Sequence, residues 1–398
     1  MATQVISSIR ASGGDYTSLS AWIAAMQTTY PNLVTADVQL IAECYNDWTG
    51  GLVDSVTVSG FTTDATRNII IRAASGHGHG GVIGGGFKIT NSSSYCIGLT
   101  QDFSIVENIE AIQTSPKSFS NSAFVINGSN CVADRCIGKS NFYAFLLERY
   151  NNSPGVSPIA RNCIAYSSGY GIGANTWMKY DIYNCTSVNC GVGFVDSHAT
   201  GVPHTITNCV AHNCTTSYSS SNDSALTAFN NAASDATLVA PLGTNPLLLD
   251  VVDADFLDVT NGDYHLAAGS KLIDVGYDLT GIVDFDIDGA VRVAPFDIGA
   301  DELGATVPVT ITVLDQTTKQ PVQNAHVYLF DSSYASILSG TTDVNGQYST
   351  SIPIVTAFTA SGWVRQYDLL NTDYKQSDIT VNITAFGAQI TILLVREI

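Results

Sequence analysis

Charged side chains are scarce in this sequence: 16 Lys and Arg and 35 Asp and Glu make up 13% of its 398 residues. The formal net charge of -19 argues against binding to the phosphate backbone of nucleic acids, which needs clustered basic residues. No apolar run approaches the ~20 residues of a membrane-spanning helix, so no membrane insertion is expected. The N-terminal residues lack a charged segment followed by an apolar one, and we therefore expect no signal peptide.

Signatures of common catalytic and metal sites are also missing. The sequence has no Cys-x-x-Cys pair, which argues against a zinc site built from cysteines. Neither Gly-x-Ser-x-Gly, a Walker sequence nor His-Glu-x-x-His occurs. The nine cysteines are an odd number, and without an export signal they suggest free thiols in a reducing compartment.

What the sequence does contain is a repeat between Ser104 and Cys214. Five blocks of four residues recur, and their last residues are Ile109, Cys136, Cys163, Cys185 and Cys209, spaced 27, 27, 22 and 24 positions apart. A period in the twenties is typical of a solenoid, in which each unit buries its apolar face against the next. Short β-branched runs without helical periodicity predict that the unit is made of strands. We therefore predict a parallel β-helix.

Two columns of residues give this prediction its detail. The third residue of each block is Asn108, Asn162, Asn184 or Asn208, with Arg135 interrupting the series. Asn tolerates the left-handed region that a bend between short strands requires, so these side chains are expected to stack as a ladder. The cysteines are expected to form a buried ladder beside it. Cys190 and Cys214 form a second column, and a bridge between them after oxidation stays open.

The segments around the repeat complete the architecture. Leu19, Trp22, Ile23 and Met26 have helical spacing after Thr17 or Ser18 as N-cap, which predicts a helix that covers the first coil. We predict an N-terminal cap over 1–50, the β-helix with its closing segment over 51–304, and a β-sandwich over 305–398. The fold class is all-β: a right-handed parallel β-helix with a capping helix, then a small Ig-like or transthyretin-like β-sandwich.

Specific motifs carry a resemblance to known families. The order NPL, GDYHLAAGSKLIDVG, DIDGAVR and DIGADE between 245 and 302 resembles the C-terminal segment of right-handed β-helix proteins of the pectate-lyase-like superfamily. The opening GGDYTSLSAWIAAM is similar to the N-terminal cap of that group. The stretch VTITVLDQTTKQPVQNAHVYLFD, followed by GTTDVNGQY, resembles the transthyretin-like or carboxypeptidase-regulatory-like accessory module. The superfamily includes polysaccharide lyases, hydrolases, phage tailspikes and adhesins, so the resemblance implies a fold and no single activity.

Candidate catalytic residues come from the repeat itself. Two positions before the cysteine column, consecutive coils carry Glu107, Asp134, Arg161, Tyr183 and Thr207. Two carboxylates and an Arg about 5 Å apart could divide acid and base roles, as on the faces of β-helix polysaccharide enzymes. The alternative, which we favour, is a polar face whose neighbouring charges are paired. Tyr183 and Trp177 are candidates for stacking on a glycan.

Two further groups are candidates for metal binding. Asp284, Asp286 and Asp288 match the first half of a calcium loop, but Pro295 stands where an EF-hand needs its bidentate Glu. A structural turn is the favoured interpretation, and calcium is the alternative to having no cofactor. His77 and His79 in the glycine-rich loop are two residues apart, with nothing nearby in the sequence to complete a site.

Three functions remain open. The first, which we favour, is a bacteriophage virion structural protein, such as a capsid or tail decoration, spike or fibre. It would assemble in the host cytoplasm with other virion proteins. A homotrimer is one option for its assembly, and binding to a host-surface polysaccharide is an option for its function. The second is a polysaccharide lyase or glycoside hydrolase, and the third is a secreted, extracellular adhesin. Whether the protein is an enzyme stays open, and we favour a protein that is not one.

Overall fold

The computed structural model describes residues 2–92, 94–116, 121–148, 157–174, 179–196, 204–220, 226–235, 250–304, 306–315, 318–330, 336–353, 358–366, 377–383 and 388–394. The chain forms two compact units, Met1–Glu302 and Leu303–Ile398. Among the described residues, no helix is long and apolar enough to cross a bilayer.

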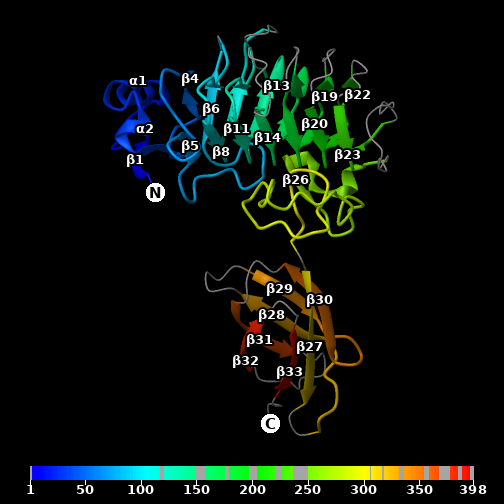
Figure 1. Cartoon of the computed structure of the whole chain (residues 1–398). Helices are drawn as coiled ribbons and strands as arrows, with labels where there is room; N and C mark the ends of the chain where they lie inside the picture. The colour runs from blue at the N-terminus through cyan, green and yellow to red at the C-terminus, as the bar shows by residue number, and fades with distance from the viewer. Residues whose placement is uncertain are drawn as a thin grey trace. The chain divides into compact units, whose positions relative to one another are not determined.

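The first unit is a stack of short strands, because each repeat supplies one strand to each of three parallel sheets (Figure 1). Sheet 1 contains, in stacking order, β1 (Thr3–Ile9), β2 (Val38–Cys44), β5 (Ile69–Ala73), β8 (Ile105–Glu107), β11 (Val132–Asp134), β14 (Ile159–Arg161), β17 (Asp181–Tyr183), β20 (His204–Thr207) and β23 (Leu226–Phe229). Its strands are paired in parallel throughout, as each coil lies on the coil before it.

The other two sheets follow the same order. Sheet 2 contains β3 (Leu52–Val53), β6 (Lys88–Asn91), β9 (Glu110–Gln113), β12 (Ile137–Ser140), β15 (Ile164–Tyr166), β18 (Thr186–Val188), β21 (Val210–His212) and β24 (Ala232–Ala233). Sheet 3 contains β4 (Val56–Val58), β7 (Ile97–Leu99), β10 (Phe124–Ile126), β13 (Tyr143–Leu147), β16 (Tyr170–Ala174), β19 (Val192–Asp196) and β22 (Thr216–Ser220). The three sheets are stacked as in a right-handed parallel β-helix, which confirms the predicted architecture of this unit.

The turn between sheets 1 and 2 is left-handed in every coil of the repeat. Asn108, Asn162, Asn184 and Asn208 have φ between 45° and 57°. Arg135 also adopts this conformation, with φ 51°, so it fills the turn position and does not interrupt the backbone column. A second left-handed column that was not predicted lies between sheets 2 and 3, at Ser167, Asn189 and Asn213.

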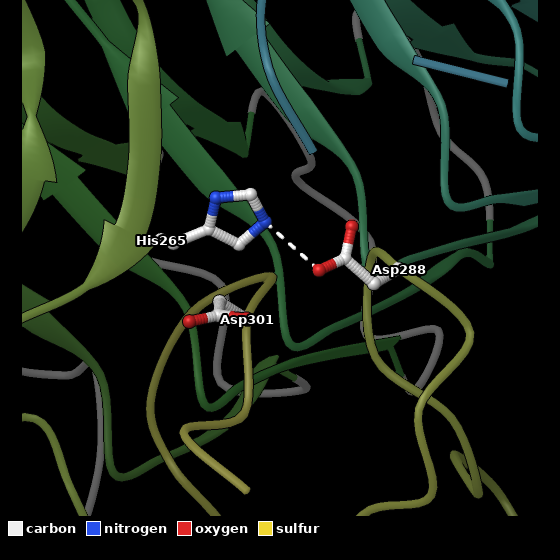
Figure 2. Close-up of side chains that lie close together, drawn as sticks. All are labelled: His265, Asp288 and Asp301. Carbon is white, nitrogen blue, oxygen red and sulfur yellow. Dashed lines mark hydrogen bonds and ion pairs between the residues drawn. The ribbon is translucent and has the colours of Figure 1, made fainter. Parts of the chain in front are cut away.

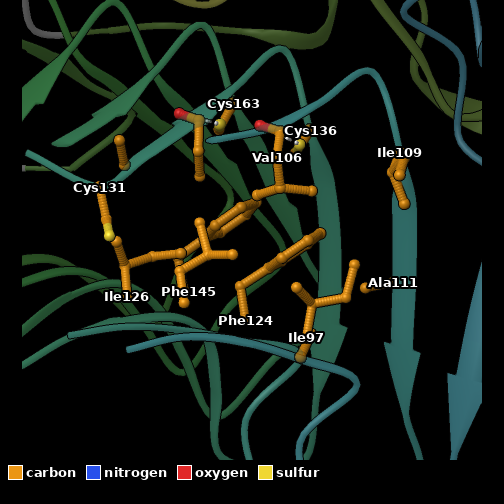
Figure 3. Close-up of a cluster of buried hydrophobic side chains, with 14 of the residues drawn as sticks. Ile97, Val106, Ile109, Ala111, Phe124, Ile126, Cys131, Cys136, Phe145 and Cys163 are labelled. Atoms are coloured by element: carbon orange, nitrogen blue, oxygen red, sulfur yellow. Dashed lines mark hydrogen bonds between the residues drawn. The ribbon is translucent and has the colours of Figure 1, made fainter. Parts of the chain in front are cut away.

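The core between the sheets is built from columns of like side chains. All nine cysteines are buried free thiols, which confirms the predicted cysteine ladder. Figure 3 shows Cys136 and Cys163 beside apolar side chains of the neighbouring coils. Phe124 and Phe145 stack with ring centroids 4.7 Å apart and an interplanar angle of 7°. Such stacking follows from the parallel register, which places these residues one above the other.

The N-terminal end of the stack is covered by α1 (Leu19–Thr29), followed by the short helix α2 (Leu33–Ala36). Ser18 is the N-cap, and its side chain accepts a hydrogen bond from the backbone N–H of Ala21, as the sequence predicted. Leu19, Trp22 and Met26 are buried against the core. The strand β1 was not predicted, and with β2 it extends sheet 1 into the segment expected to be a cap.

The closing segment, residues 250–302, follows the last coil. It contains the 3-10 turns η1 (Asp253–Asp255) and η2 (Val259–Asn261) and an antiparallel pair, β25 (Phe256–Asp258) and β26 (Asp263–Leu266). The backbone N–H of Ala300 donates to Thr186 Oγ1 on sheet 2. His212 on the same sheet pairs with Asp253 at 2.7 Å. The segment therefore packs against the outer side of sheet 2.

The second unit has two sheets. One contains β30 (Gln347–Pro353), β27 (Thr306–Asp315) and β33 (Ala388–Leu394), in that order, and the other contains β29 (Ser336–Thr341), β28 (Ala325–Phe330), β31 (Phe358–Gln366) and β32 (Ser377–Ile383). Ile311, Val313, Val322, Ala325 and Val327 are buried. The assignment of this unit to the transthyretin-like family stays a prediction.

Candidate functional site

The predicted column of polar residues forms on the outer face of sheet 1. The strand registers pair Glu107 with Asp134, Asp134 with Arg161, Arg161 with Tyr183, and Tyr183 with Thr207. The parallel register fixes this alignment, because each strand has three or four residues and the middle one points into the core. The residues that the sequence named are therefore brought together.

The charges of this column are paired between neighbouring coils. Glu107 accepts a hydrogen bond from Arg135 at 2.7 Å, and Asp134 accepts one from Arg161 at 3.1 Å. Asp134 also accepts from the side-chain amide of Asn162 at 3.0 Å, and its side chain is 6% exposed. Arg135 therefore has a second role in the turn position, because its guanidinium neutralises the carboxylate of the coil before it.

The column continues toward the N-terminus, beyond the repeat that the sequence shows. Arg72 is paired in register with Glu107, and its guanidinium contacts Glu43 at 2.7 Å. A pocket of about 250 Å³ opens here, lined by Glu43, Arg72, Ala73, Ser75, Glu107, Asn108 and Arg135. Acids and guanidinium groups alternate around it, which suits a polar ligand that both accepts and donates hydrogen bonds.

The two glycan candidates have different outcomes. Tyr183 is partly buried, because its ring packs against Leu279, Val283 and Phe296 of the closing segment. Burial raises the pKa of Tyr183 to about 12. Part of the ring is covered by the protein itself, which reduces the area open to a sugar. Trp177 lies outside the described residues.

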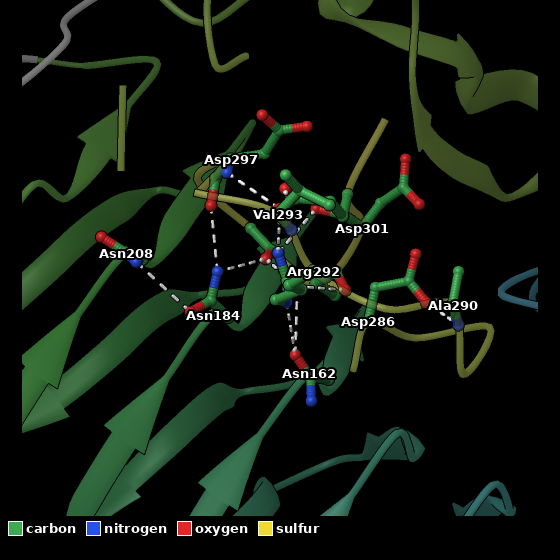
Figure 4. Close-up of polar contacts among 12 residues, drawn as sticks. Asn162, Asn184, Asn208, Asp286, Ala290, Arg292, Val293, Asp297 and Asp301 are labelled. Atoms are coloured by element: carbon green, nitrogen blue, oxygen red, sulfur yellow. Dashed lines mark hydrogen bonds and ion pairs between the residues drawn. The ribbon is translucent and has the colours of Figure 1, made fainter. Parts of the chain in front are cut away.

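The asparagine ladder holds the closing segment in place. Asn184 donates to the backbone carbonyls of Asp297 and Gly299 (Figure 4). Asn208 donates to the backbone carbonyl of Tyr277. Asn208 also donates to Asn184 Oδ1 at 3.3 Å, so these two side chains form the stacked pair that was predicted. The ladder therefore binds a distant part of the chain in addition to shaping its own turns.

Arg292 is the centre of this network. Its guanidinium donates to Asn162 Oδ1 and to the backbone carbonyls of Gly299 and Ala300, and it forms a 2.8 Å ion pair with Glu302 (Figure 4). The Arg292 side chain is 0% exposed. A buried charge requires such complete pairing. The DIDGAVR and DIGADE motifs therefore have a structural role: through Arg292 they bind the closing segment to Asn162 of the repeat.

The three aspartates of the proposed calcium loop have separate hydrogen-bond partners. Asp286 accepts from the backbone N–H groups of Asp288 and Ala290, and Asp284 accepts from that of Gly281. The carboxylate of Asp288 contacts His265, outside the aspartate loop. Burial raises the pKa of Asp286. These contacts are those of a structural turn, with Gly289 at φ 85°.

A second cluster, absent from the sequence interpretation, surrounds His265. Its Nε2 lies 3.0 Å from Asp288 Oδ2 (Figure 2). Its Nδ1 contacts Asp263. The neighbouring carboxylates outweigh burial and raise the pKa of His265 to about 10, with the hydrogen bond to Asp288 foremost. Burial raises the pKa of Asp301 to about 6. Among the described residues, His265, Asp288 and Asp301 form the one group of three or more potential metal ligands within reach of each other.

The two histidines of the glycine-rich loop are separated. His77 Nδ1 accepts from the backbone N–H of Asn46, and its ring contacts that of Tyr45. His79 is buried near the His265 cluster, and burial lowers its pKa to about 4. Its Nε2 lies 2.9 Å from the Arg135 carbonyl, and its Nδ1 accepts from the Gly81 N–H. A neutral ring protonated on Nε2 satisfies both contacts.

No family model and no curated protein matches this chain. Among solved structures, it is similar to the pectate lyase Pel9A at 14% identity and a TM-score of 0.40, covering 76% of this chain and 97% of that one. It is also similar to the pectin methylesterase from Aspergillus niger at 14% identity and a TM-score of 0.38, covering 71% of this chain and 93% of that one. Both are likenesses of fold at low identity, and no residue role comes with them.

Sequence reasoning missed several of these residues for identifiable reasons. Glu43 and Arg72 lie in coils whose turn and strand residues do not follow the visible repeat. His265 and Asp301 lie within two of the motifs that suggested the superfamily, GDYHL and DIGADE. In the sequence, these motifs indicated only the fold. The two side chains come close to each other only when the closing segment folds.

Proposed function

We propose that this protein is a structural component of a bacteriophage particle, in the class of capsid or tail decorations, spikes and fibres. The observation that favours this role over an enzymatic one is the pairing of the charges in the outer column of sheet 1. Glu107 and Asp134 are each engaged by an arginine of a neighbouring turn or coil. Carboxylates held in this way stabilise the face on which they lie, whereas a general acid or base needs a carboxyl group free to exchange a proton with substrate.

The architecture supports a mechanical role. Sheet 1 runs without a break through nine strands, and the turn residues extend the backbone hydrogen bonding between coils. The backbone N–H of Asn108 donates to the Asp134 carbonyl, and that of Asn184 donates to the Thr207 carbonyl. A solenoid bonded along its whole length resists bending and local opening. Such a unit suits a projection from a particle surface.

The partners follow from this role as part of the same proposal. The protein would assemble in the host cytoplasm with other virion proteins, and a trimer is the assembly to look for first. The second unit would serve as an accessory module for attachment. A polar face with paired charges, such as the pocket at Glu43 and Glu107, would contact a host-surface polysaccharide.

Mass spectrometry of purified phage particles from the source of this sequence tests the proposal. We expect peptides from both units at a constant ratio to the major capsid protein after density-gradient purification. A comparison fraction from the same lysate without particles controls for contamination. If the chain is absent from particles and is recovered in the culture medium, the virion assignment is wrong and the extracellular adhesin becomes the leading function.

A polysaccharide lyase or hydrolase is the second candidate function. One observation favours it: a pocket of about 250 Å³ contains Glu43 and Glu107 beside Arg72 and Arg135. Enzymes of this kind use paired carboxyl groups near a guanidinium group as catalytic residues. The purified protein should be screened against acidic and neutral polysaccharides, with and without calcium. We expect binding without product release.

Two variants decide between these functions. Release of product that disappears in both Glu107→Gln and Asp134→Asn, with nearly unchanged melting temperatures, would overturn the structural interpretation. Asp278→Asn is the matched control, because Asp278 is on the closing segment and bonds to Thr280. Binding that survives in the control and is lost in the variants without any cleavage would support a glycan-recognising spike.

A further inference from the structure

The His265 cluster joins three separate parts of the closing segment. His265 lies on β26, Asp288 lies in the turn after Asp286, and Asp301 lies near the end of the segment. We propose that His265, Asp288 and Asp301 form a zinc site that holds these parts together. This site is separate from the outer column of sheet 1.

The spacing of the donor atoms fits a single ion. The nearest ligand atoms of the three residues all lie within 4.8 Å of one another, and His265 Nε2 is 3.0 Å from Asp288 Oδ2. Ligand atoms bonded at about 2.1 Å around a tetrahedral zinc are roughly 3.4 Å apart. A shift of at most about 1.4 Å in the widest pair would bring the three ligand atoms to this spacing, and water would take the fourth position.

The surrounding contacts already orient the ligands. Asp263 contacts His265 Nδ1, so the ring presents Nε2 to Asp288. A carboxylate on the far nitrogen of a metal-bound histidine is the usual outer partner in zinc sites. Asp301 Oδ2 accepts from the backbone N–H of Leu266 at 2.7 Å, which holds that carboxylate beside the ring. Among the described residues, no donor contacts Asp301 Oδ1, so this oxygen is available to a cation.

Gly81 of the glycine-rich loop lies directly against the cluster. A Cβ at this position would lie 2.2 Å from His265 Nε2 and 3.2 Å from Asp288 Oδ1. Only glycine therefore fits at this position, because its backbone lies next to both donors. Asp288 is 40% exposed, which gives an ion a route from solvent, whereas Asp301 is 6% exposed.

The donor set selects the kind of ion. One imidazole and two carboxylates suit zinc, whereas calcium prefers six or more oxygen ligands. His79 is excluded as a fourth ligand in this arrangement, because Arg135 and Gly81 occupy its two nitrogens. The proposal also differs from a calcium loop at Asp284, Asp286 and Asp288, because Asp284 has no part in it.

Zinc titration of the full-length protein tests the site. The protein is stripped with a chelator, exchanged into chelator-free buffer and titrated with ZnCl₂ by calorimetry, and its melting temperature is followed in parallel. We expect one zinc per chain and a higher melting temperature for the first unit, because an ion that binds the folded state stabilises it. Visible absorption of the Co²⁺-substituted protein should report four-coordinate nitrogen and oxygen ligation.

Asp288→Asn is the main variant, because the exposed side chain can change without opening the core. It should weaken zinc binding about tenfold or more. Asp284→Asn is the matched control, four residues away on the same segment, and should bind zinc like the wild type. The melting temperature of each variant without metal shows whether it is folded.

Three results would overturn the proposal. The first is no zinc binding at micromolar concentrations, and the second is binding that Asp288→Asn leaves unchanged. The third is binding of calcium, in preference to zinc, that both Asp284→Asn and Asp288→Asn abolish, which would assign the ion to the aspartate loop. If Asp288→Asn does not fold, Asp263→Asn gives a second test, with about 10-fold to 100-fold weaker zinc binding expected.

Discussion

Asn184 shows how one residue serves both a turn and a distant contact. Its backbone has φ 45°, a region that costs most side chains roughly 1–2 kcal/mol and that Asn tolerates. Its buried amide group bonds to the carbonyls of Asp297 and Gly299 and to Asn208. Each such bond contributes about 0.5–1.5 kcal/mol.

We therefore predict that Asn184→Ala lowers the free energy of unfolding by about 2–4 kcal/mol. Asn184→Gly should cost about 1 kcal/mol less, because glycine adopts the turn without strain while losing the same hydrogen bonds. Chemical denaturation of the two variants measures both values. If both variants lose the same free energy of unfolding, the left-handed backbone at residue 184 does not contribute to the cost of alanine.

Glu110 is a buried carboxyl group on sheet 2. It is 0% exposed, accepts from the Tyr166 hydroxyl at 2.7 Å and from the Gly84 N–H at 3.1 Å, and burial raises its pKa above the ordinary 4.5. The folded protein therefore holds this proton more tightly than the unfolded chain. Its contribution to stability is present at low pH and is lost as pH rises through the raised pKa.

Glu110→Gln removes this titration, because the amide carries no charge; its oxygen can accept from the Gly84 N–H while its NH₂ donates to the Tyr166 hydroxyl oxygen. The variant should gain stability relative to wild type as pH rises from about 4.5 through the raised pKa. Urea denaturation of both proteins at several pH values measures the difference. A difference that stays constant with pH would show that Glu110 does not titrate differently on folding.

At the scale of the element, four consecutive coils place a cysteine at the same point in the core: Cys136, Cys163, Cys185 and Cys209. Cys136, Cys163 and Cys185 are 0% exposed, and burial raises the pKa of each thiol. A thiol must ionise and be reached before it reacts. Burial and a raised pKa therefore both protect the thiols of the ladder from reaction.

We predict that these thiols do not react with a thiol reagent in the native protein over minutes, whereas all nine cysteines react after denaturation. Mass spectrometry of alkylated peptides identifies each site. Rapid native labelling of Cys185 would contradict a closed core. Cys185→Asp should prevent folding, because it places an unpaired charge there.

At the scale of the whole molecule, the chain divides after Glu302 into two compact units. The buried ion pair of Arg292 with Glu302 lies within the first unit, and we therefore expect that this unit does not require residues beyond this point for its stability. Connections between such units are the usual sites of proteolytic cleavage.

Limited proteolysis should therefore cut near Leu303–Val307 and leave a folded first unit. Deletion of 306–398 should give a soluble protein whose circular dichroism and melting transition match those of the first unit in the full chain. Insoluble protein from this deletion, with full-length protein soluble under the same expression conditions, would show that the two units fold as one.

The sequence by itself determined the coil. The period in the twenties, the asparagine at the left-handed turn and the cysteine beside it are local features, since strand length and turn chemistry depend on adjacent residues. The helix α1 was likewise predicted from its spacing and its N-cap. The outer column Glu107, Asp134 and Arg161 followed from the period alone.

The tertiary structure alone decided what the closing segment does. Arg292 meets Asn162 across 130 positions of sequence, and Asn184 bonds to carbonyls 113 and 115 positions away. Most acceptors in these contacts are backbone carbonyls, which every residue carries, so no residue type marks them in the sequence. The same holds for His265, Asp288 and Asp301, because separate passes of one segment must fold against the stack before their side chains meet.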